Sequence, residues 1–264
     1  MDEKFDFQLM RTLLAVAFNI LMPTTVVADT LTGSFHRETV DVSAYPWTAI
    51  GKVFNEAGGA CTGVIISRDK ILTAAHCIYS ERAQRFLPPS SLHFLIGYRS
   101  GRSTAHARVA RYEIGAGYNP RRWNETMQAD WVILTLTRNL PEEIEPLKMS
   151  QGAAPSGTRA IIAGYPLDRP HMMTADRNCQ LGGDVGSLLF HTCRGVRGYS
   201  GAPILVISPD NEVRVAGIHI GTTGRNGIKQ MVAVPARSIS WAATEPPLGI
   251  YKVVDAVTSS AASN

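Results

Sequence analysis

The chain has 264 residues, of which 45% are hydrophobic and 18% are charged, so its composition is that of a globular protein rather than a disordered one. Its formal net charge at pH 7 is only +4. Lysine and arginine are scattered and form no long basic run, which argues against nucleic acid as a partner.

The N-terminal residues have the pattern of a secretory signal. Met10 and Arg11 are followed by the almost wholly apolar run Leu13–Met22 and then by small residues that end at Ala28. This succession predicts a signal peptide over residues 1–28, with cleavage after Ala28. The apolar run is too short for a comfortable membrane span. We therefore expect a secreted or periplasmic protein with no stable membrane span.

The residues before Met10 suit such a signal poorly, because Asp2, Glu3 and Asp6 place negative charge where a basic region is expected. This favours Met10 as the true start of translation. An uncleaved membrane anchor is the alternative to a removed signal.

Short apolar or alternating runs recur along the rest of the chain between turn residues. Their spacing, with almost no helical periodicity, predicts an all-β barrel or sandwich. The predicted strands are Thr48–Phe54, Gly63–Ile66, Ile71–Thr73, Leu92–Ile96, Ala107–Ile114, Trp131–Leu136, Arg159–Ala163, Leu188–Thr192, Ile204–Ile207, Val213–Ile220 and Met231–Val234.

Composition also divides the chain into segments. Residues 141–157 are rich in Pro, Glu, Gly and Ser, which is typical of a linker between two halves. A short helix is expected at Ser238–Ala243, before a tail in which Pro, Gly, Ser and Ala dominate. The expected order is an N-terminal segment (29–45), a first barrel (46–140), the linker (141–157), a second barrel with the helix (158–243) and a loose tail (244–264).

Three polar residues have surroundings that suggest chemistry. His76 lies in Thr73–Cys77, Asp130 precedes the apolar run Trp131–Leu136, and Ser200 lies in the glycine-rich Gly198–Pro203. A serine nucleophile needs an imidazole to take its proton, and a carboxylate entering an apolar strand needs a donor such as the other imidazole N–H. The hypothesis is a catalytic triad. The alternatives are an exposed loop histidine, an aspartate that caps a turn and a serine in a plain turn.

These motifs resemble the chymotrypsin-like (trypsin-fold) serine endopeptidases, and within them the bacterial glutamyl endopeptidases. Cys61–Ile66 followed by Ile71–Cys77 looks like the family's strand, turn, strand and histidine loop. Ala163–Pro166 and Ala216–His219 look like the glutamyl branch in particular. The similarity runs in patches from about Pro46 to about Pro235.

The resemblance implies two six-stranded antiparallel β-barrels, a short C-terminal helix and a site in the cleft between the barrels. It also implies a peptidase that works through an acyl-enzyme, with His76 as general base, Asp130 as the group that orients it and Ser200 as nucleophile. The backbone N–H groups of Gly198 and Ser200 are assigned to the oxyanion hole. Protein or peptide substrates, a monomer and no cofactor are expected.

The four cysteines of a secreted chain should be paired, and spacing alone leaves three pairings open. The resemblance favours Cys61 with Cys77, which leaves Cys179 with Cys193. The competing interpretation is a zinc site built from Cys61, Cys77 and His76. It lacks a Cys-x2–4-Cys pair, so we expect no metal.

The substrate pocket departs from the glutamyl pattern. His219 matches the branch's pocket histidine, but Gly195 stands where the branch has Thr or Ser, which puts a glutamate preference in doubt. Arg194 and Arg197 are candidates to replace the lost donor, because a guanidinium suits a carboxylate. Arg194 also stands where trypsin-like specificity requires an aspartate, so cleavage after Lys or Arg is disfavoured.

The activation apparatus of the resembled family is also incomplete. Its zymogens carry an aspartate just before the serine, which pairs with a newly freed N-terminal amine, and here that residue is Tyr199. No Ile-Val-Gly-Gly start follows Ala28. We therefore expect this switch to be absent, with Arg37-Glu38 as a candidate processing point.

Two other functions remain open. A non-catalytic trypsin-fold binding protein would keep the barrels and lose a triad residue. An esterase of the α/β-hydrolase type would need Gly-x-Ser-x-Gly between a strand and a helix and would place its histidine last, whereas His76 comes first here.

Overall fold

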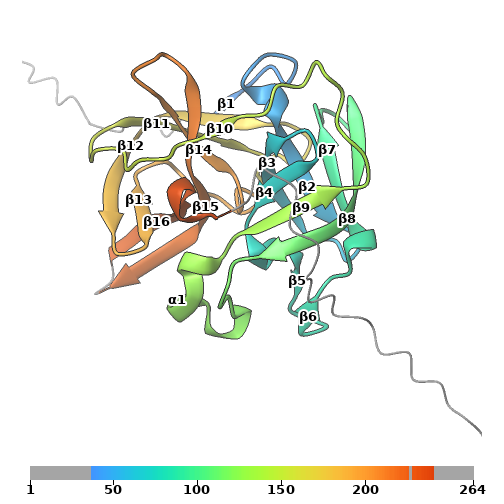
Figure 1. The fold of residues 1–264 in the computed structure, drawn as a ribbon, viewed down its shortest axis with the longest axis horizontal. Coiled ribbons are helices and arrows are strands. Elements are labelled where there is room, and N and C mark those ends of the chain that lie inside the picture. The colour runs from blue at the N-terminus through green and yellow to red at the C-terminus, as the bar shows by residue number, and fades with distance from the viewer. Residues whose placement is uncertain (1–36, 226–227, 241–264) are drawn as a thin grey trace, which may run out of the picture. The chain divides into compact units, whose positions relative to one another are not determined.

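The structure is a computed structural model in which residues 37–225 and 228–240 are described. The predicted signal and tail lie outside these residues, as do 241–243 of the expected C-terminal helix. Within them the chain is mostly strands, drawn from blue to red in Figure 1. The one α-helix of the described residues is α1 (Trp123–Thr126), and the last regular element is a 3-10 turn, Ala236–Ser238.

The first half of the chain forms a closed antiparallel barrel in the strand order β2-β3-β4-β9-β8-β7 (Figure 1). Its interior is filled by fully buried apolar side chains such as Val64, Leu72, Phe94 and Leu134. Successive side chains of a strand point to opposite faces of the sheet. The apolar residues in each strand sequence therefore place one face of every strand in the core. The strands are β2 (Ile50–Asn55), β3 (Ala60–Ser67), β4 (Lys70–Thr73), β7 (Leu92–Ile96), β8 (Ala105–Ile114) and β9 (Val132–Leu136).

The second half forms a barrel in the order β12-β11-β14-β15-β16-β13, which the pairing of β12 with β13 closes. Two short strands are added at its outside: β1 (Glu38–Thr39) pairs with β12, and β10 (Lys148–Met149) pairs in parallel with β15. The barrel strands are β11 (Arg159–Gly164), β12 (Thr174–Val185), β13 (Leu188–His191), β14 (Pro203–Ile207), β15 (Val213–Arg225) and β16 (Ile228–Pro235).

The prediction of two six-stranded barrels is thus confirmed, and each predicted run overlaps a barrel strand, although Thr48 and Ala49 precede β2, Trp131 precedes β9 and Thr192 follows β13. One barrel strand, β12, was missed. It reads TADRNCQLGGDV, with acidic, amide and glycine residues that disfavour strands, and many of its side chains face outward. Its place in the sheet is decided by pairing with β11 and β13 rather than by its own sequence. The short pair β5 (Tyr79–Ser80) and β6 (Arg85–Phe86) was also missed.

Both disulfides implied by the resemblance are present. Cys61 on β3 is bonded to Cys77 just after β4, with their Cα atoms 6.1 Å apart, and Cys179 on β12 is bonded to Cys193 after β13, with 4.6 Å between Cα atoms. Each bridge lies directly beside a segment that carries a candidate catalytic residue.

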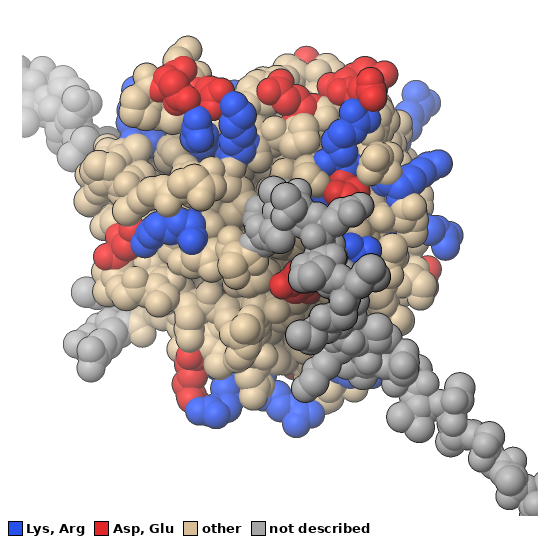
Figure 2. Space-filling view, viewed as in Figure 1, with Lys and Arg blue, Asp and Glu red and all other residues tan. Residues whose placement is uncertain are grey.

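The larger apolar core contains residues of both barrels, so the barrels pack against each other through shared side chains. Among the residues the structure describes, no helix is long and apolar enough to cross a membrane. On the face shown in Figure 2, acidic and basic side chains are interspersed around the edge and form no large area of one sign.

Candidate active site

His76 lies on a 3-10 turn, Ala75–Ile78, that directly follows β4. The turn is fixed on both sides: Thr73 Oγ1 donates to the Thr62 carbonyl at 2.7 Å, and Cys77 is bonded to Cys61 on β3. The imidazole is partly exposed, at 30% of its side chain. It is therefore held rigidly at the backbone while its ring remains accessible.

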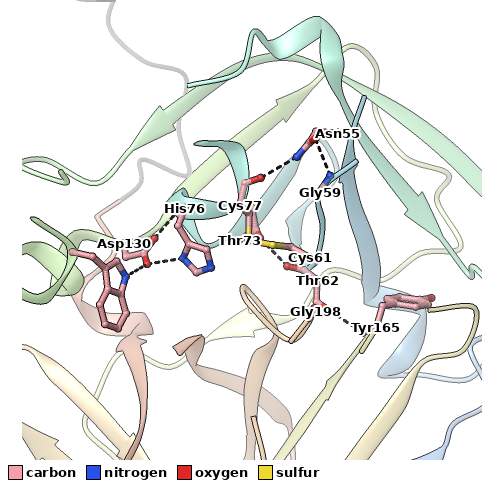
Figure 3. Close-up of a disulfide and its surroundings, with 11 residues drawn as sticks. Asn55, Gly59, Cys61, Thr62, Thr73, His76, Cys77, Asp130, Tyr165 and Gly198 are labelled. Carbon is pink, nitrogen blue, oxygen red and sulfur yellow. Dashed lines mark hydrogen bonds and ion pairs between the residues drawn. A yellow bond between two sulfur atoms is a disulfide. The ribbon is translucent and has the colours of Figure 1, made fainter. Parts of the chain in front are cut away.

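Asp130 is fully buried at the start of the run that forms β9. His76 Nδ1 lies 2.7 Å from its Oδ2, and the His76 backbone N–H donates to its Oδ1 at 2.9 Å (Figure 3). The Trp123 indole N–H donates to Oδ2 at 2.6 Å. Three donors offset the cost of burying this carboxylate. Because a carboxylate oxygen accepts, His76 Nδ1 carries the proton and Nε2 is left to accept one.

Ser200 lies in a loop that packs against the end of β4. Its carbonyl accepts from the Thr62 backbone N–H at 2.9 Å. At Gly201 (φ +77°) a Cβ atom would lie 2.1 Å from Thr73 Oγ1 and 2.8 Å from the Ala74 nitrogen, so glycine is required for this close approach. The loop thus contacts the residues that lead into His76.

Within the described residues, no hydrogen bond joins Ser200 Oγ to His76. Catalytic hydrogen bonds of this kind are often long without substrate and tighten in the complex. The contact that ties Ser200 to the first barrel is the one its carbonyl makes with the Thr62 N–H, and a contact of its hydroxyl with His76 stays a prediction.

Two backbone donors of the same loop are open. The N–H groups of Gly198 and Ser200 have no hydrogen-bond partner among the described residues, whereas the Tyr199 N–H between them donates to the Val196 carbonyl at 2.9 Å. The Gly198 carbonyl is held by Thr62 Oγ1 at 2.9 Å. Unpaired donors in an ordered loop beside a serine are what an oxyanion hole requires.

The candidate pocket residues His219 and Gly195 are adjacent. A Cβ atom on Gly195 would lie 2.4 Å from His219 Nε2, so the histidine ring occupies the space that a Thr or Ser at this position would need. His219 is buried on β15, and its Nδ1 lies 3.1 Å from Nε2 of the buried His191. The His219 ring therefore occupies the space that the side chain of a Thr or Ser at position 195 would take.

Burial disfavours the charged form of both histidines. Burial, followed by the charges of His191 and His76, lowers the pKa of His219 well below its ordinary value. Burial also lowers the pKa of His191 to about 4. A carboxylate approaching His219 would have to reverse this effect for the ring to become charged.

Arg194 and Arg197 have exposed side chains. The Arg194 backbone N–H donates to Asp176 Oδ2 at 2.9 Å, and the Arg197 carbonyl accepts from the Leu167 N–H at 2.8 Å. Both of these contacts are made by the backbone. A role for either guanidinium in the pocket stays a prediction.

The zinc interpretation meets a chemical obstacle. Ligand atoms of Cys61, His76 and Cys77 do lie within 4.8 Å of one another. The two sulfurs, however, are bonded to each other and cannot act as thiolate ligands.

Sequence reasoning missed Thr62 and Trp123. Thr62, from the first barrel, holds the Gly198 carbonyl and accepts from the Tyr165 N–H at 2.9 Å, so one hydroxyl joins two segments of the second barrel. Trp123 begins α1 and reaches Asp130 from seven residues away. Thr62 lies within the Cys61–Ile66 segment, but that pattern gives its hydroxyl no role, and Trp123 belongs to no motif.

Two closed six-stranded barrels, with the candidate site between them, define the trypsin fold. In agreement, a family model described as Trypsin matches residues 36–240. The chain belongs to this family of serine proteases. The all-β fold also removes the α/β-hydrolase alternative.

The relatives are distant. The chain is 27% identical over 209 residues to serine protease SP24D of Anopheles gambiae, which covers 75% of this chain and 69% of that protein. It is 28% identical over 167 residues to serine protease 23 of Homo sapiens, covering 55% of this chain and 43% of that protein. The chain thus matches less than half the length of the second relative.

A solved structure of a Glu endopeptidase in complex with MPD is similar with a TM-score of 0.64 and 20% identity, covering 76% of this chain and 90% of that one. At this identity the likeness shows the fold.

Proposed function

We propose that the protein is a secreted serine endopeptidase that cleaves peptide bonds through His76, Asp130 and Ser200. The observation that carries the proposal is the 2.7 Å contact between His76 Nδ1 and Asp130 Oδ2, beside a serine loop packed on Thr73 and Ala74, which lead into the turn that bears the histidine. Membership of the trypsin family supports the same reaction class.

In the proposed reaction Ser200 Oγ attacks the substrate carbonyl carbon while His76 Nε2 takes the hydroxyl proton. His76 then gives this proton to the departing amine, which leaves an acyl group on Ser200. Water, deprotonated by the same nitrogen, attacks the acyl carbon and releases the acid. Asp130 holds the imidazole in the required tautomer and stabilises its charged form.

The negative oxygen formed in each attack needs donors that are already in place. The open N–H groups of Gly198 and Ser200 are proposed for this role, and loss of one such donor typically costs about 3 kcal/mol of transition-state stabilisation. The Gly198 carbonyl bond to Thr62 Oγ1 keeps the peptide in position.

We further propose that His219 sets the preference for the substrate residue before the cleaved bond. It is the polar side chain packed against Gly195, five residues before the proposed nucleophile. An acidic preference requires His219 to be charged when the substrate carboxylate is bound, so cleavage after glutamate should be most efficient at mildly acidic pH.

The central test uses a serine-directed organophosphonate and a peptide library on the purified mature protein. Labelling should occur at Ser200 and should disappear in Ser200→Ala together with peptidase activity, while Ser90→Ala, which changes an exposed serine, retains both. A protein that binds peptides but neither cleaves them nor reacts with the label would be the non-catalytic binding protein instead. Sequencing of the mature N-terminus tests cleavage after Ala28.

A further inference from the structure

Arg37 lies at the beginning of the described chain and forms a bidentate ion pair with Asp168. Its side chain is only 11% exposed. Nη1 donates to Asp168 Oδ1 at 3.1 Å, and Nη2 contacts Asp168 Oδ2. This bidentate contact raises the pKa of Arg37 and lowers the pKa of Asp168. Such geometry is more specific than that of most surface pairs.

The same guanidinium faces the residue that precedes the proposed nucleophile. Arg37 Cζ lies 6.0 Å from the centre of the Tyr199 ring, within the range of a cation–π contact. Tyr199 is fully buried. Its hydroxyl donates to the Thr174 carbonyl at 2.8 Å and lies 2.6 Å from Thr174 Oγ1. Arg37 therefore faces the tyrosine through both its ring and its hydroxyl, since a hydrogen-bond interaction with Tyr199 also helps to raise the pKa of Arg37.

The backbone beside Arg37 is held in place independently. Strand β1 pairs with β12 so that Thr39 lies opposite Thr174, and the Val40 N–H donates to the Met173 carbonyl at 3.3 Å. Thr174 thus pairs with the N-terminal strand through its backbone and with Tyr199 through its side chain and carbonyl. Strand β1, which directly follows Arg37, pairs with Thr174, and Thr174 also binds the Tyr199 hydroxyl. This common partner places Arg37 beside Tyr199.

Asp168 belongs to a second segment, residues 165–168, that contacts the serine loop. It follows Leu167, whose N–H donates to the Arg197 carbonyl at 2.8 Å. The preceding backbone is equally close, since a Cβ atom on Gly198 (φ +95°) would lie 2.3 Å from the Tyr165 carbonyl oxygen. Arg37 therefore contacts both supports of the loop, Tyr199 directly and the 165–168 segment through Asp168.

We propose that Arg37 is a positioning residue that holds the loop Arg197–Ser200 with its two N–H groups aimed at the oxyanion. This inference rests on the proposed peptidase function. In the resembled zymogens a freed N-terminal amine supports the residue before the serine. Here that residue is Tyr199. The positive group beside it is the Arg37 guanidinium, which is present without any cleavage of the chain. Cleavage between Arg37 and Glu38 would therefore inactivate the enzyme, and the mature N-terminus must precede Arg37.

The experiment compares Arg37→Ala, Arg37→Lys and a matched control, Arg177→Ala, in the full chain. Arg177 pairs with Glu38 on the same N-terminal strand, but its guanidinium lies over Trp47, 4.9 Å from the ring centre, rather than over Tyr199. Loss of one oxyanion donor costs about 10²- to 10³-fold in kcat, so partial misplacement of the loop in Arg37→Ala should cost about ten- to hundredfold. Arg177→Ala should retain wild-type kcat.

Three readouts separate positioning from general destabilisation. KM should change less than kcat, because substrate contacts outside the loop remain. Affinity for a peptide aldehyde, whose hemiacetal oxygen occupies the oxyanion hole, should fall in parallel with kcat. Low concentrations of guanidinium should partly restore Arg37→Ala and leave Arg177→Ala unchanged. Asp168→Asn should reduce kcat in the same direction, and its effect should be non-additive with that of Arg37→Ala.

Wild-type kcat in folded Arg37→Ala would overturn the inference, as would an active mature enzyme that begins at Glu38. If Arg37→Ala does not fold, Arg37→Lys and Asp168→Asn decide by the same criteria. A wild-type protein with no peptidase activity and no labelling of Ser200 would instead overturn the proposed function itself. The two failures are therefore distinguishable.

Discussion

The indole of Trp123 and the imidazole of His76 share one oxygen of Asp130. Trp123 Nε1 donates to Asp130 Oδ2 at 2.6 Å, and His76 Nδ1 lies 2.7 Å from the same oxygen. The outer edge of the indole also lies close to β15, since a Cβ atom on Gly221 would be 3.6 Å from it. Trp123 therefore links the proposed catalytic carboxylate to the strand that carries His219.

Trp123→Phe should lower kcat while leaving the fold intact. Phenylalanine keeps the apolar contact but removes the donor to Asp130, and a hydrogen bond to a charged group contributes about 1.5–3 kcal/mol, equivalent to roughly tenfold or more in rate. Steady-state kinetics on one peptide substrate would measure this. Asn124→Ala, an exposed change on the same helical turn, is the control. Equal kcat in Trp123→Phe and wild type would show that the contact does not help the triad.

Asp130→Asn should reduce kcat by about 10⁴-fold, because an amide favours the wrong imidazole tautomer in this type of triad. The asparagine has nearly the same size, so the thermal unfolding transition should remain cooperative. Measuring both quantities on the same preparation separates the two effects. A folded variant with more than about a tenth of wild-type kcat would contradict the assigned role.

Gly195→Ala should change substrate preference, because its Cβ would lie 2.4 Å from His219 Nε2 and would displace the ring. If His219 reads the substrate side chain, kcat/KM should fall more for glutamyl substrates than for neutral ones. Gly152→Ala is the matched control, since no atom lies within 4 Å of its added Cβ. An equal loss on all substrates would show that His219 does not set the preference.

His191 should make the protein less stable in acid. Its pKa is about 4 in the folded state against an ordinary value of 6.5, so between these pH values the unfolded chain binds a proton that the folded chain does not. The free energy of unfolding should therefore decrease as the pH falls from 6.5 to about 4, by about 3 kcal/mol from this residue. Urea titrations across this range should show a shallower pH dependence in His191→Gln. The exposed variant His171→Gln should keep the wild-type slope, and an unchanged slope in His191→Gln would refute the prediction.

Replacing Cys179 and Cys193 together by serine should lower the free energy of unfolding by about 3 kcal/mol, the chain-entropy value for a loop of this length. The bridge spans 14 positions and leads into the serine loop, so kcat should also fall. Denaturant unfolding and kinetics of the oxidised wild type and the double variant would test both effects. Full activity in the variant would show that the loop is held by its other contacts alone.

The sequence predicts the two barrels because their signals are local, and it marks the three catalytic candidates by equally local motifs. His76 and Ser200 have distinctive neighbours, and most strands have apolar runs bounded by turn residues. Strand β12 could not be predicted in this way, because its polar residues are held by pairing with strands on both sides.

The supporting contacts around the site depend on residues far apart in the chain. Thr62 and Gly198 are separated by 136 positions, and Arg37 and Asp168 by 131. No sequence pattern links such pairs, since Thr62 meets Gly198 through the packing of one barrel on the other and Arg37 is brought near Asp168 by the pairing of β1 with β12. The sequence therefore points to the candidate catalytic residues. It does not point as readily to the residues that hold them in position.

The hydroxyl of Thr62 has a consequence for how the enzyme would fail on heating. It is fully buried in the seam between the barrels, where it donates to the Gly198 carbonyl and accepts from the Tyr165 N–H. Any slippage of one barrel against the other must break these bonds before either sheet melts. On heating, peptidase activity should therefore be lost at a lower temperature than the circular dichroism signal. Activity depends on the relative position of the two barrels, whereas the signal depends on the strands within each barrel.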